Sequence, residues 1–316
     1  MGQTERQSSC GMIGRGKGGR AGRGWLALLT FAVALFVAAP TQAQSREDGA
    51  PAESLGVADA VRASAWGPAA IFANPAALMR VNLLAVEAAY SYLQGKDGHN
   101  FGLSMVDAKT NPDVALGVAY NYFSTAPAGR DRDGSQVRLG LATGYRSNDV
   151  NLYAGIGVRW LSLTLGKPDD DEGVTETDDI DTWTADIGLL LEFDRRIRFA
   201  VVGQNLIDTK TPEAPRVLGL GLSFVFNVID VGASIDLDLS QGSDRAVSTW
   251  GFGADFTIID AVHLRAGFVR DEAYDAERMT FGLGWASDGV AVDIGYATAL
   301  ADPTAMTLAV SLRWVP

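Results

Sequence analysis

Apolar residues alternate with small, polar or charged residues over roughly a dozen short stretches between residues 83 and 314. In the last stretch, one set of alternate positions is apolar and the other is small or polar. The apolar set is Met306, Leu308, Val310, Leu312 and Trp314, and the other set is Thr307, Ala309, Ser311 and Arg313. Successive side chains of a β-strand point to opposite faces, so each stretch predicts a strand with one apolar face.

The repetition of this pattern favours a membrane barrel over a soluble sheet. The apolar rows of residues 137–145 and 152–160 end in Tyr145 and Trp160. Aromatic residues at the ends of lipid-facing rows are typical of the girdles at a bilayer's two interfaces. The chain is therefore predicted to be an all-β protein, a transmembrane antiparallel up-and-down β-barrel. A secreted soluble β-sandwich is the alternative.

The N-terminus predicts export. Four basic residues (Arg15, Lys17, Arg20 and Arg23) precede an apolar run at 25–38, and the small residues Thr41 and Ala43 stand at the positions that a signal peptidase requires. Residues 1–43 are therefore expected to be a signal peptide cleaved after Ala43. The apolar run is too short for a comfortable transmembrane helix. The predicted location is the bacterial outer membrane, with its lipid and lipopolysaccharide as surroundings.

Charge and cysteine content exclude several functions. Cleavage after Ala43 would leave 273 residues with 21 basic and 37 acidic side chains, a net charge of −16. Such a chain is not expected to bind nucleic acid. The single cysteine, Cys10, lies in the leader, so disulfides and thiol chemistry are not expected. Neither His99 nor His263 has an assignable nucleophile beside it, and two histidines do not build a typical zinc site. We therefore expect no enzyme activity, metal or cofactor.

Three segments follow the leader. Residues 44–54 are expected to be a flexible lead-in, residues 55–80 an N-terminal hatch, and residues 81–316 the barrel. The hatch is rich in alanine and interrupted by Pro68 and Pro75, which excludes a central strand. Phe72, Asn74 and Pro75 would place an aromatic ring and a restricted turn in the barrel's mouth. The sequence is equally compatible with a movable gate and a static plug.

About 14 strands are expected, an even number as in bacterial single-chain barrels. Tight turns are predicted at one end of the barrel and longer loops at the other, except in the first hairpin. The predicted longer loops are 125–135, 166–180, 208–214, 240–247 and 271–277. The predicted strands begin near Leu83, His99, Val114, Gln136, Asn151, Trp183, Ile197, Arg216, Asp230, Ser248, Val262, Met279, Val290 and Met306. Many of the 36 glycines fall inside strands, where they would let a plug approach the wall closely.

Charged residues that alternate with apolar neighbours are predicted to line the lumen. An arginine on the lipid face costs about 2–4 kcal/mol near the midplane, so these side chains must point inward. The predicted lumen-lining residues are Arg138, Arg159, Asp186, Arg198, Asp236, Asp255, Arg265, Asp293 and Arg313. They could form a polar conduit or orient a ligand. Alternatively, they form internal salt bridges that fill a narrow barrel.

An acidic stretch is predicted in the longest external loop. It comprises Asp169, Asp170, Asp171, Glu172, Glu176, Asp178, Asp179 and Asp181. Carboxylates suit Ca²⁺ or the divalent ions that bridge lipopolysaccharide, but the spacing matches no EF-hand loop. A solvated loop without a metal site is the preferred interpretation.

Several motifs resemble a known superfamily. The segments that carry the resemblance are 56–63, 69–78, 185–189, 202–206, 215–219 and 264–268. The second contains Asn74-Pro75-Ala76, which resembles the element that leads into the first strand of FadL-type and PorV-type outer-membrane proteins. The other matches look closer to the PorV-type branch. The resemblance implies a 14-stranded barrel with an N-terminal hatch.

The resemblance implies two functions. FadL-type proteins pass hydrophobic compounds, so the chain is expected to pass or bind a small hydrophobic molecule through a hatch-gated lumen. The alternative is a structural or accessory barrel of an envelope secretion or assembly machine, with envelope proteins as partners. The chain lacks the large external loops of FadL-type fatty acid channels, and it ends in Trp314-Val315-Pro316 instead of a terminal phenylalanine.

Overall fold

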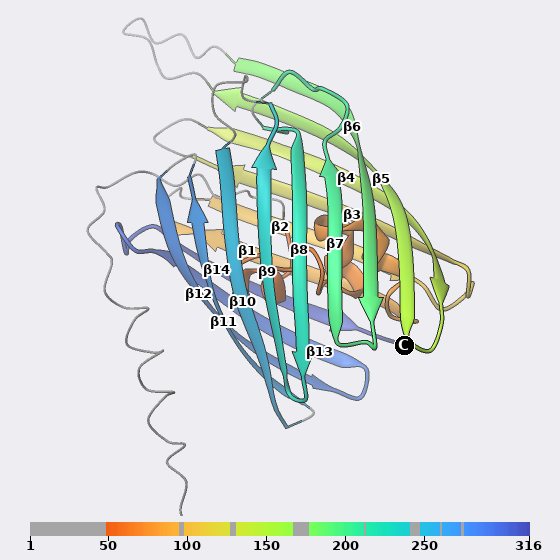
Figure 1. Cartoon of the computed structure of the whole chain (residues 1–316). Helices are drawn as coiled ribbons and strands as arrows, with labels where there is room; N and C mark the ends of the chain where they lie inside the picture. Colours follow the sequence, from red (N-terminus) through yellow and green to blue (C-terminus); the bar gives the residue numbers. More distant parts are fainter. Residues whose placement is uncertain are drawn as a thin grey trace, which may run out of the picture. The chain divides into compact units, whose positions relative to one another are not determined.

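The computed structural model describes residues 49–94, 98–126, 131–166, 177–211, 213–240, 247–259, 261–272 and 275–316. Fourteen antiparallel strands close into one barrel, in which each strand pairs with its sequence neighbours and β1 pairs with β14 (Figure 1). This confirms the predicted fold class. The strands are β1 Leu84–Leu93, β2 Gly98–Asp107, β3 Val114–Thr125, β4 Arg132–Arg146, β5 Val150–Gly166, β6 Thr177–Phe193, β7 Ile197–Gln204, β8 Val217–Phe226, β9 Ile229–Asp238, β10 Val247–Ile259, β11 Val262–Asp271, β12 Ala276–Ser287, β13 Val290–Ala299 and β14 Met306–Trp314.

Eleven strands begin within one residue of the predicted position, whereas β4, β6 and β12 begin four, six and three residues earlier. The largest difference is in β6, whose first residues are polar and lack the apolar alternation. Residues 177–180 were therefore wrongly predicted as loop, and Asp179 and Asp181 lie in a strand. The other predicted acidic loop residues, apart from Asp178, lie outside the described residues.

The barrel has two different ends. The connections β4–β5, β6–β7, β8–β9, β10–β11 and β12–β13 are two or three residues long and lie with the C-terminus at what we call the turn end. The opposite, loop end carries the longer connection between β7 and β8. At the turn end, Asp288 and Gly289 both have positive φ (50° and 79°), as a tight two-residue hairpin requires.

The two faces of the wall differ as the alternation predicts. In β14, Leu312 and Trp314 are more than half exposed on the outer face, whereas Ser311 and Arg313 are at most 2% exposed inside. Outward aromatic residues lie near both ends of the wall. Those near the turn end include Tyr145, Phe226, Trp285 and Trp314, and those near the loop end include Tyr122, Trp183 and Trp250.

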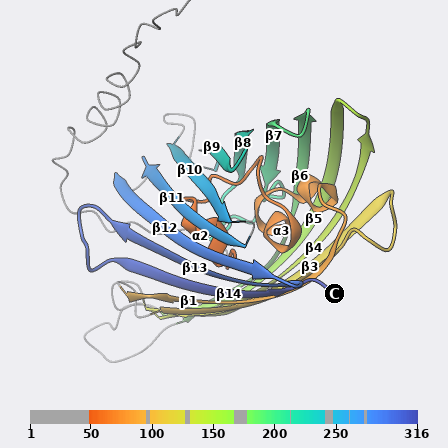
Figure 2. The same ribbon diagram turned by 90° about the horizontal axis from the view of Figure 1, so that it is seen from below.

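The N-terminal segment lies inside the ring of strands (Figure 2). It contains α2 Ala52–Gly56, η1 Gly67–Ala69, α3 Ala70–Ala73 and η2 Pro75–Met79, where η marks a 3₁₀ helix. We call residues 52–80 the hatch; its first helix begins three residues earlier than expected. No helix in the described part of the chain is long and apolar enough to cross a membrane.

Glycines on the inner wall make room for the hatch. A side chain at Gly253 would overlap Val57, and one at Gly155 would overlap the backbone of Pro75 and Ala76. The other wall glycines that meet the hatch include Gly117, Gly140, Gly188, Gly221, Gly232, Gly251, Gly267, Gly282 and Gly295. This belt confirms that strand glycines allow close approach of a plug, and it explains why so many of them lie within strands.

Candidate functional site

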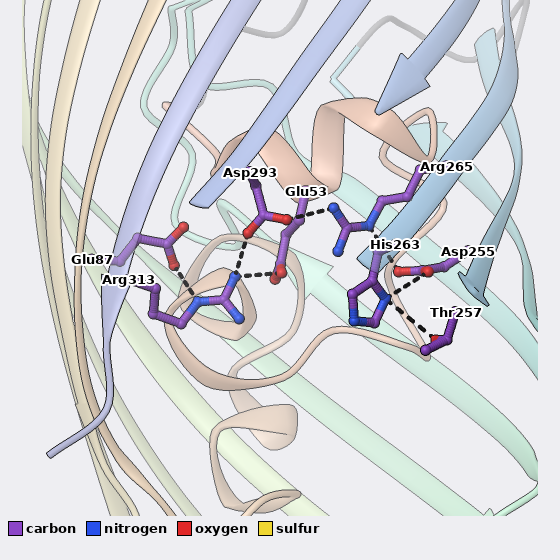
Figure 3. A network of polar contacts seen from close by, with 8 residues as sticks. All are labelled: Glu53, Glu87, Asp255, Thr257, His263, Arg265, Asp293 and Arg313. Carbon is purple, nitrogen blue, oxygen red and sulfur yellow. Dashed lines mark hydrogen bonds and ion pairs between the residues drawn. The ribbon is translucent and has the colours of Figure 1, made fainter. Parts of the chain in front are cut away.

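The first anchor of the hatch is Arg313, which lies at the seam where the barrel closes (Figure 3). Arg313 in β14 stands directly opposite Glu87 in β1, and its Nε lies 3.1 Å from the Glu87 carboxylate. The same guanidinium bonds Glu53 of α2 and Asp293 of β13, the latter at 3.3 Å. It also lies 4.4 Å from the ring centre of Trp66. Arg313 therefore joins the seam to the hatch.

The network continues along the wall through Arg265. Its guanidinium bonds Asp293 at 2.5 Å and Asp255 at 2.8 Å, and Asp255 also bonds His263 Nδ1 at 2.9 Å. Two arginines thus serve four carboxylates, those of Glu53, Glu87, Asp255 and Asp293. Carboxylates thus outnumber guanidiniums in this network. Substitution of either arginine would leave a buried carboxylate without a partner, which destabilises the fold.

A second anchor holds the middle of the hatch. Arg62 forms two hydrogen bonds with Asp236 of β9, at 3.1 and 2.9 Å, and a third with the carbonyl oxygen of Ala73 at 2.6 Å. Arg62 is 7% exposed. This side chain therefore ties both halves of the hatch to the wall.

Asn74 and Phe72 hold the second half of the hatch. The Asn74 carboxamide accepts from the Ala76 amide at 3.0 Å and donates to the Arg62 carbonyl at 3.1 Å, and Asn74 is fully buried. Pro75 follows as the first residue of η2, where its missing N–H is no loss. Gln204 of β7 donates to the Phe72 carbonyl at 2.9 Å.

Further polar groups fill the part of the lumen that strands β4 to β9 surround, which we call the β4–β9 side. Arg138 lies 3.8 Å from Asp186, which also accepts from the Asn205 amide at 2.8 Å. Asn205 in turn accepts from Arg159 at 3.4 Å. Nearer the turn end, Arg198 pairs with Glu192 and Asp230 at 2.9 and 2.8 Å. All nine predicted lumen-lining residues therefore face inward, and each has a polar partner; whether they line a conduit or only fill the barrel stays a prediction.

Several contact residues were not predicted. Glu53 and Arg62 lie in the hatch, where no strand alternation gives their direction, and Asn205 begins the β7–β8 connection. Glu87 and Glu192, in contrast, occupy inward positions of alternating strands, so the pattern that gave Asp255 could also have found them.

Two cavities lie on opposite sides of the hatch. The loop-end cavity is partly open and has a volume of about 130 Å³; its lining includes Phe72, Leu55, Asn100 and Arg278. The turn-end cavity is also partly open and has a volume of about 220 Å³; its lining includes Trp66, Asp230, Asp255 and His263. Both cavities touch Val61 and Ala69. These small hatch residues therefore separate them.

No protein-family model and no curated protein sequence matches the chain. Solved structures match its fold. A FadL homologue from Pseudomonas aeruginosa aligns with a TM-score of 0.57 at 11% identity, over 87% of this chain and 99% of that one. The toluene transporter TodX from P. putida aligns with a TM-score of 0.57 at 14% identity, over 79% and 94% of the two chains.

The chain has the FadL-type barrel fold. A TodX mutant described as a monoaromatic hydrocarbon channel also aligns, with a TM-score of 0.54 at 14% identity over 86% of this chain and 98% of that one. At these identities the likeness concerns the fold: a FadL-type barrel with an N-terminal segment inside it. The resemblance to PorV-type proteins stays a prediction.

Proposed function

We propose that this FadL-type barrel resides in the bacterial outer membrane, after export by its signal peptide, and passes or binds a small hydrophobic molecule through a hatch-gated lumen. The observation that carries the proposal is the pair of cavities divided by Val61 and Ala69. A ligand in one cavity needs only a local shift of the hatch to reach the other. The known transport of toluene by TodX, which shares the fold, is consistent with this role.

The outer surface supports the membrane location. Apolar side chains cover the outward face of the strands, and aromatic residues stand near both of its ends. This is the arrangement that a bilayer with two interfaces favours. The turn end would then face the periplasm and the loop end the outside.

The size of the loop-end cavity limits the ligand. A closed cavity of about 150 Å³ holds one benzene molecule, so the partly open space of about 130 Å³ is large enough for most of a single small ring. Phe72, Leu55 and Val61 supply apolar contacts. The side-chain oxygen of Asn100, a residue that is 4% exposed, accepts no hydrogen bond from the residues that the structure describes.

The ion pairs on the β4–β9 side support a second candidate. Arg138 forms an ion pair with Asp186, and Arg198 forms one with Asp230. Such pairs stabilise a filled barrel rather than an open pore. A structural or accessory barrel that binds envelope proteins at its rim would need no more than this.

Conductance and ligand binding separate the two candidates. We would compare the full chain with a variant lacking residues 55–80 in planar bilayers, after confirming by heat-modifiable gel migration that both are folded. Toluene binding would be followed by equilibrium dialysis with radiolabelled toluene, and Leu55→Trp would fill the loop-end cavity as a control. Transport predicts higher conductance without the hatch and toluene binding by the full chain. If neither effect is seen and envelope proteins co-purify stably with the barrel, the accessory role is favoured.

A further inference from the structure

Strand β6 extends far beyond its neighbour β7. It has 17 residues and pairs with β5 over its whole length, whereas β7 has eight residues and pairs with β6 only between Ile187 and Phe193. The β5–β6 hairpin therefore projects at the loop end (Figure 1). On the β7 side, no strand in the described part of the chain pairs with residues 177–183.

Among the described residues, no backbone group hydrogen-bonds to the β7 side of residues 179, 181 and 183. The Leu206 amide donates to the Ala185 carbonyl at 2.8 Å, and the Thr184 hydroxyl donates to the Ile207 carbonyl at 3.1 Å. The described part of the β7–β8 connection thus hydrogen-bonds to β6 only this far. Because backbone groups alternate in direction along a strand, those of Trp183, Asp181 and Asp179 point to the same side as Ala185. They present three amides and three carbonyls.

The side chains of the edge define which strand fits. Asp179 and Asp181 are exposed on the outer face, where each carboxylate accepts one hydrogen bond, from Thr164 at 3.0 Å and from Trp160 at 2.7 Å. On the inner face, Ile180 is half-buried and packs against a cluster that includes Phe123 and Ala214. An added strand would therefore meet two carboxylates on the outer face, and on the inner face Ile180 with its apolar cluster beside the polar Thr182.

We propose that residues 177–183 dock an extended segment of another envelope protein by strand addition, and that this segment alternates basic with apolar residues. Directly opposed charges of opposite sign stabilise a strand pair, and like charges destabilise it. A second copy of this chain is thus a poor occupant, because its own edge would bring aspartates against aspartates. The chain has a net charge of −12, or −16 after the expected cleavage at Ala43, which adds long-range attraction for a basic partner. The proposal does not depend on passage through the lumen.

The test uses synthetic heptapeptides with the full-length barrel in detergent. Lys-Val-Lys-Val-Lys-Val-Lys should slow hydrogen exchange at the amides of Trp183, Asp181 and Asp179. The same peptide N-methylated at alternate residues should lose this effect, because its strand-pairing amides are blocked. Protection that survives N-methylation would show surface charge attraction only and would overturn the proposal.

A second experiment tests whether Asp179 and Asp181 select a basic segment. The double variant Asp179→Lys/Asp181→Lys should bind the lysine peptide about tenfold more weakly, as expected from the loss of two favourable cross-strand pairs. It should instead accept Glu-Val-Glu-Val-Glu-Val-Glu. Heat-modifiable migration would verify that the variant barrel is folded. Equal protection by both peptides in both proteins would contradict the inference, as would no protection by either.

Discussion

Asp236→Asn is expected to release the middle of the hatch. Asp236 receives two hydrogen bonds from Arg62, the residue that also holds the Ala73 carbonyl. The substitution keeps the shape of the side chain and one acceptor oxygen but removes the negative charge. Arg62 would then keep its other contacts, including the Ala73 carbonyl, but lose its attraction to the negative charge of Asp236.

The size of the effect follows from burial and geometry. Removing one partner of a buried ion pair costs about 3–5 kcal/mol. The Asp236 side chain is 15% exposed, and asparagine keeps one hydrogen bond, so we expect a lower figure of about 2 kcal/mol. Since 1.4 kcal/mol corresponds to a tenfold change in an equilibrium, the displaced hatch should become about 30-fold more populated.

Two measurements check this expectation. Open probability in planar bilayers should rise by about that factor, and hydrogen exchange should accelerate between residues 57 and 66 while the strands stay protected. Glu277→Gln is the matched control, because Glu277 pairs with Arg270 on the neighbouring strand at 3.1 Å and makes the same charge change within the wall. The reasoning is refuted if both variants behave alike, or if hatch exchange changes less than threefold.

Three further predictions concern the seam, the glycine belt and the outer face. Arg313→Gln leaves three carboxylates without their shared guanidinium and should lower the free energy of unfolding, measured by urea titration of the barrel in vesicles, by about 3–5 kcal/mol. Adding Glu87→Gln should recover part of this loss. No recovery would argue against the Arg313–Glu87 pair. Gly253→Ala should push residues 57–60 from the wall and accelerate their exchange, whereas Gly157→Ala has room for its methyl group; equal effects would remove the steric explanation. Leu139→Arg on the outer face should cost about 2–4 kcal/mol in bilayers, and a negligible cost would exclude contact with lipid there.

The wall was predictable because the direction of a side chain in a strand is a local property. Arg313 and Asp293 could be assigned to the inner face from their immediate neighbours, and the structure places them there. The projecting part of β6 was not predicted, because strand prediction depends on local alternation of apolar and polar residues. It leaves the apolar band, so Asp179 and Asp181 lack the alternation that marks the other strands, and pairing with β5 alone keeps it extended.

The contacts between the hatch and the barrel wall could not be predicted from neighbouring residues in the sequence. Arg313 meets Glu53, which precedes it by 260 residues, and Arg62 meets Asp236 across 174 residues. Hatch helices of three to five residues are too short for a helical period to reveal which side faces the wall. Only closure of the barrel brings these partners together, so the sequence predicted that the lumen charges would be paired or functional without showing which of them hold the hatch.

The distribution of these anchors indicates how the hatch would move. Its first helix is bonded to Arg313, and its last turn packs against β4, β5 and β6. Between them, Ala58 and Asp59 have positive φ angles of 60° and 51°, a conformation that costs non-glycine residues of order 1 kcal/mol or more. This strained stretch adjoins Val61, which separates the two cavities. A shift there would relieve strain and leave both ends in place. Under the proposed transport role, we therefore expect the Arg62–Asp236 pair to open while the hatch stays in the barrel.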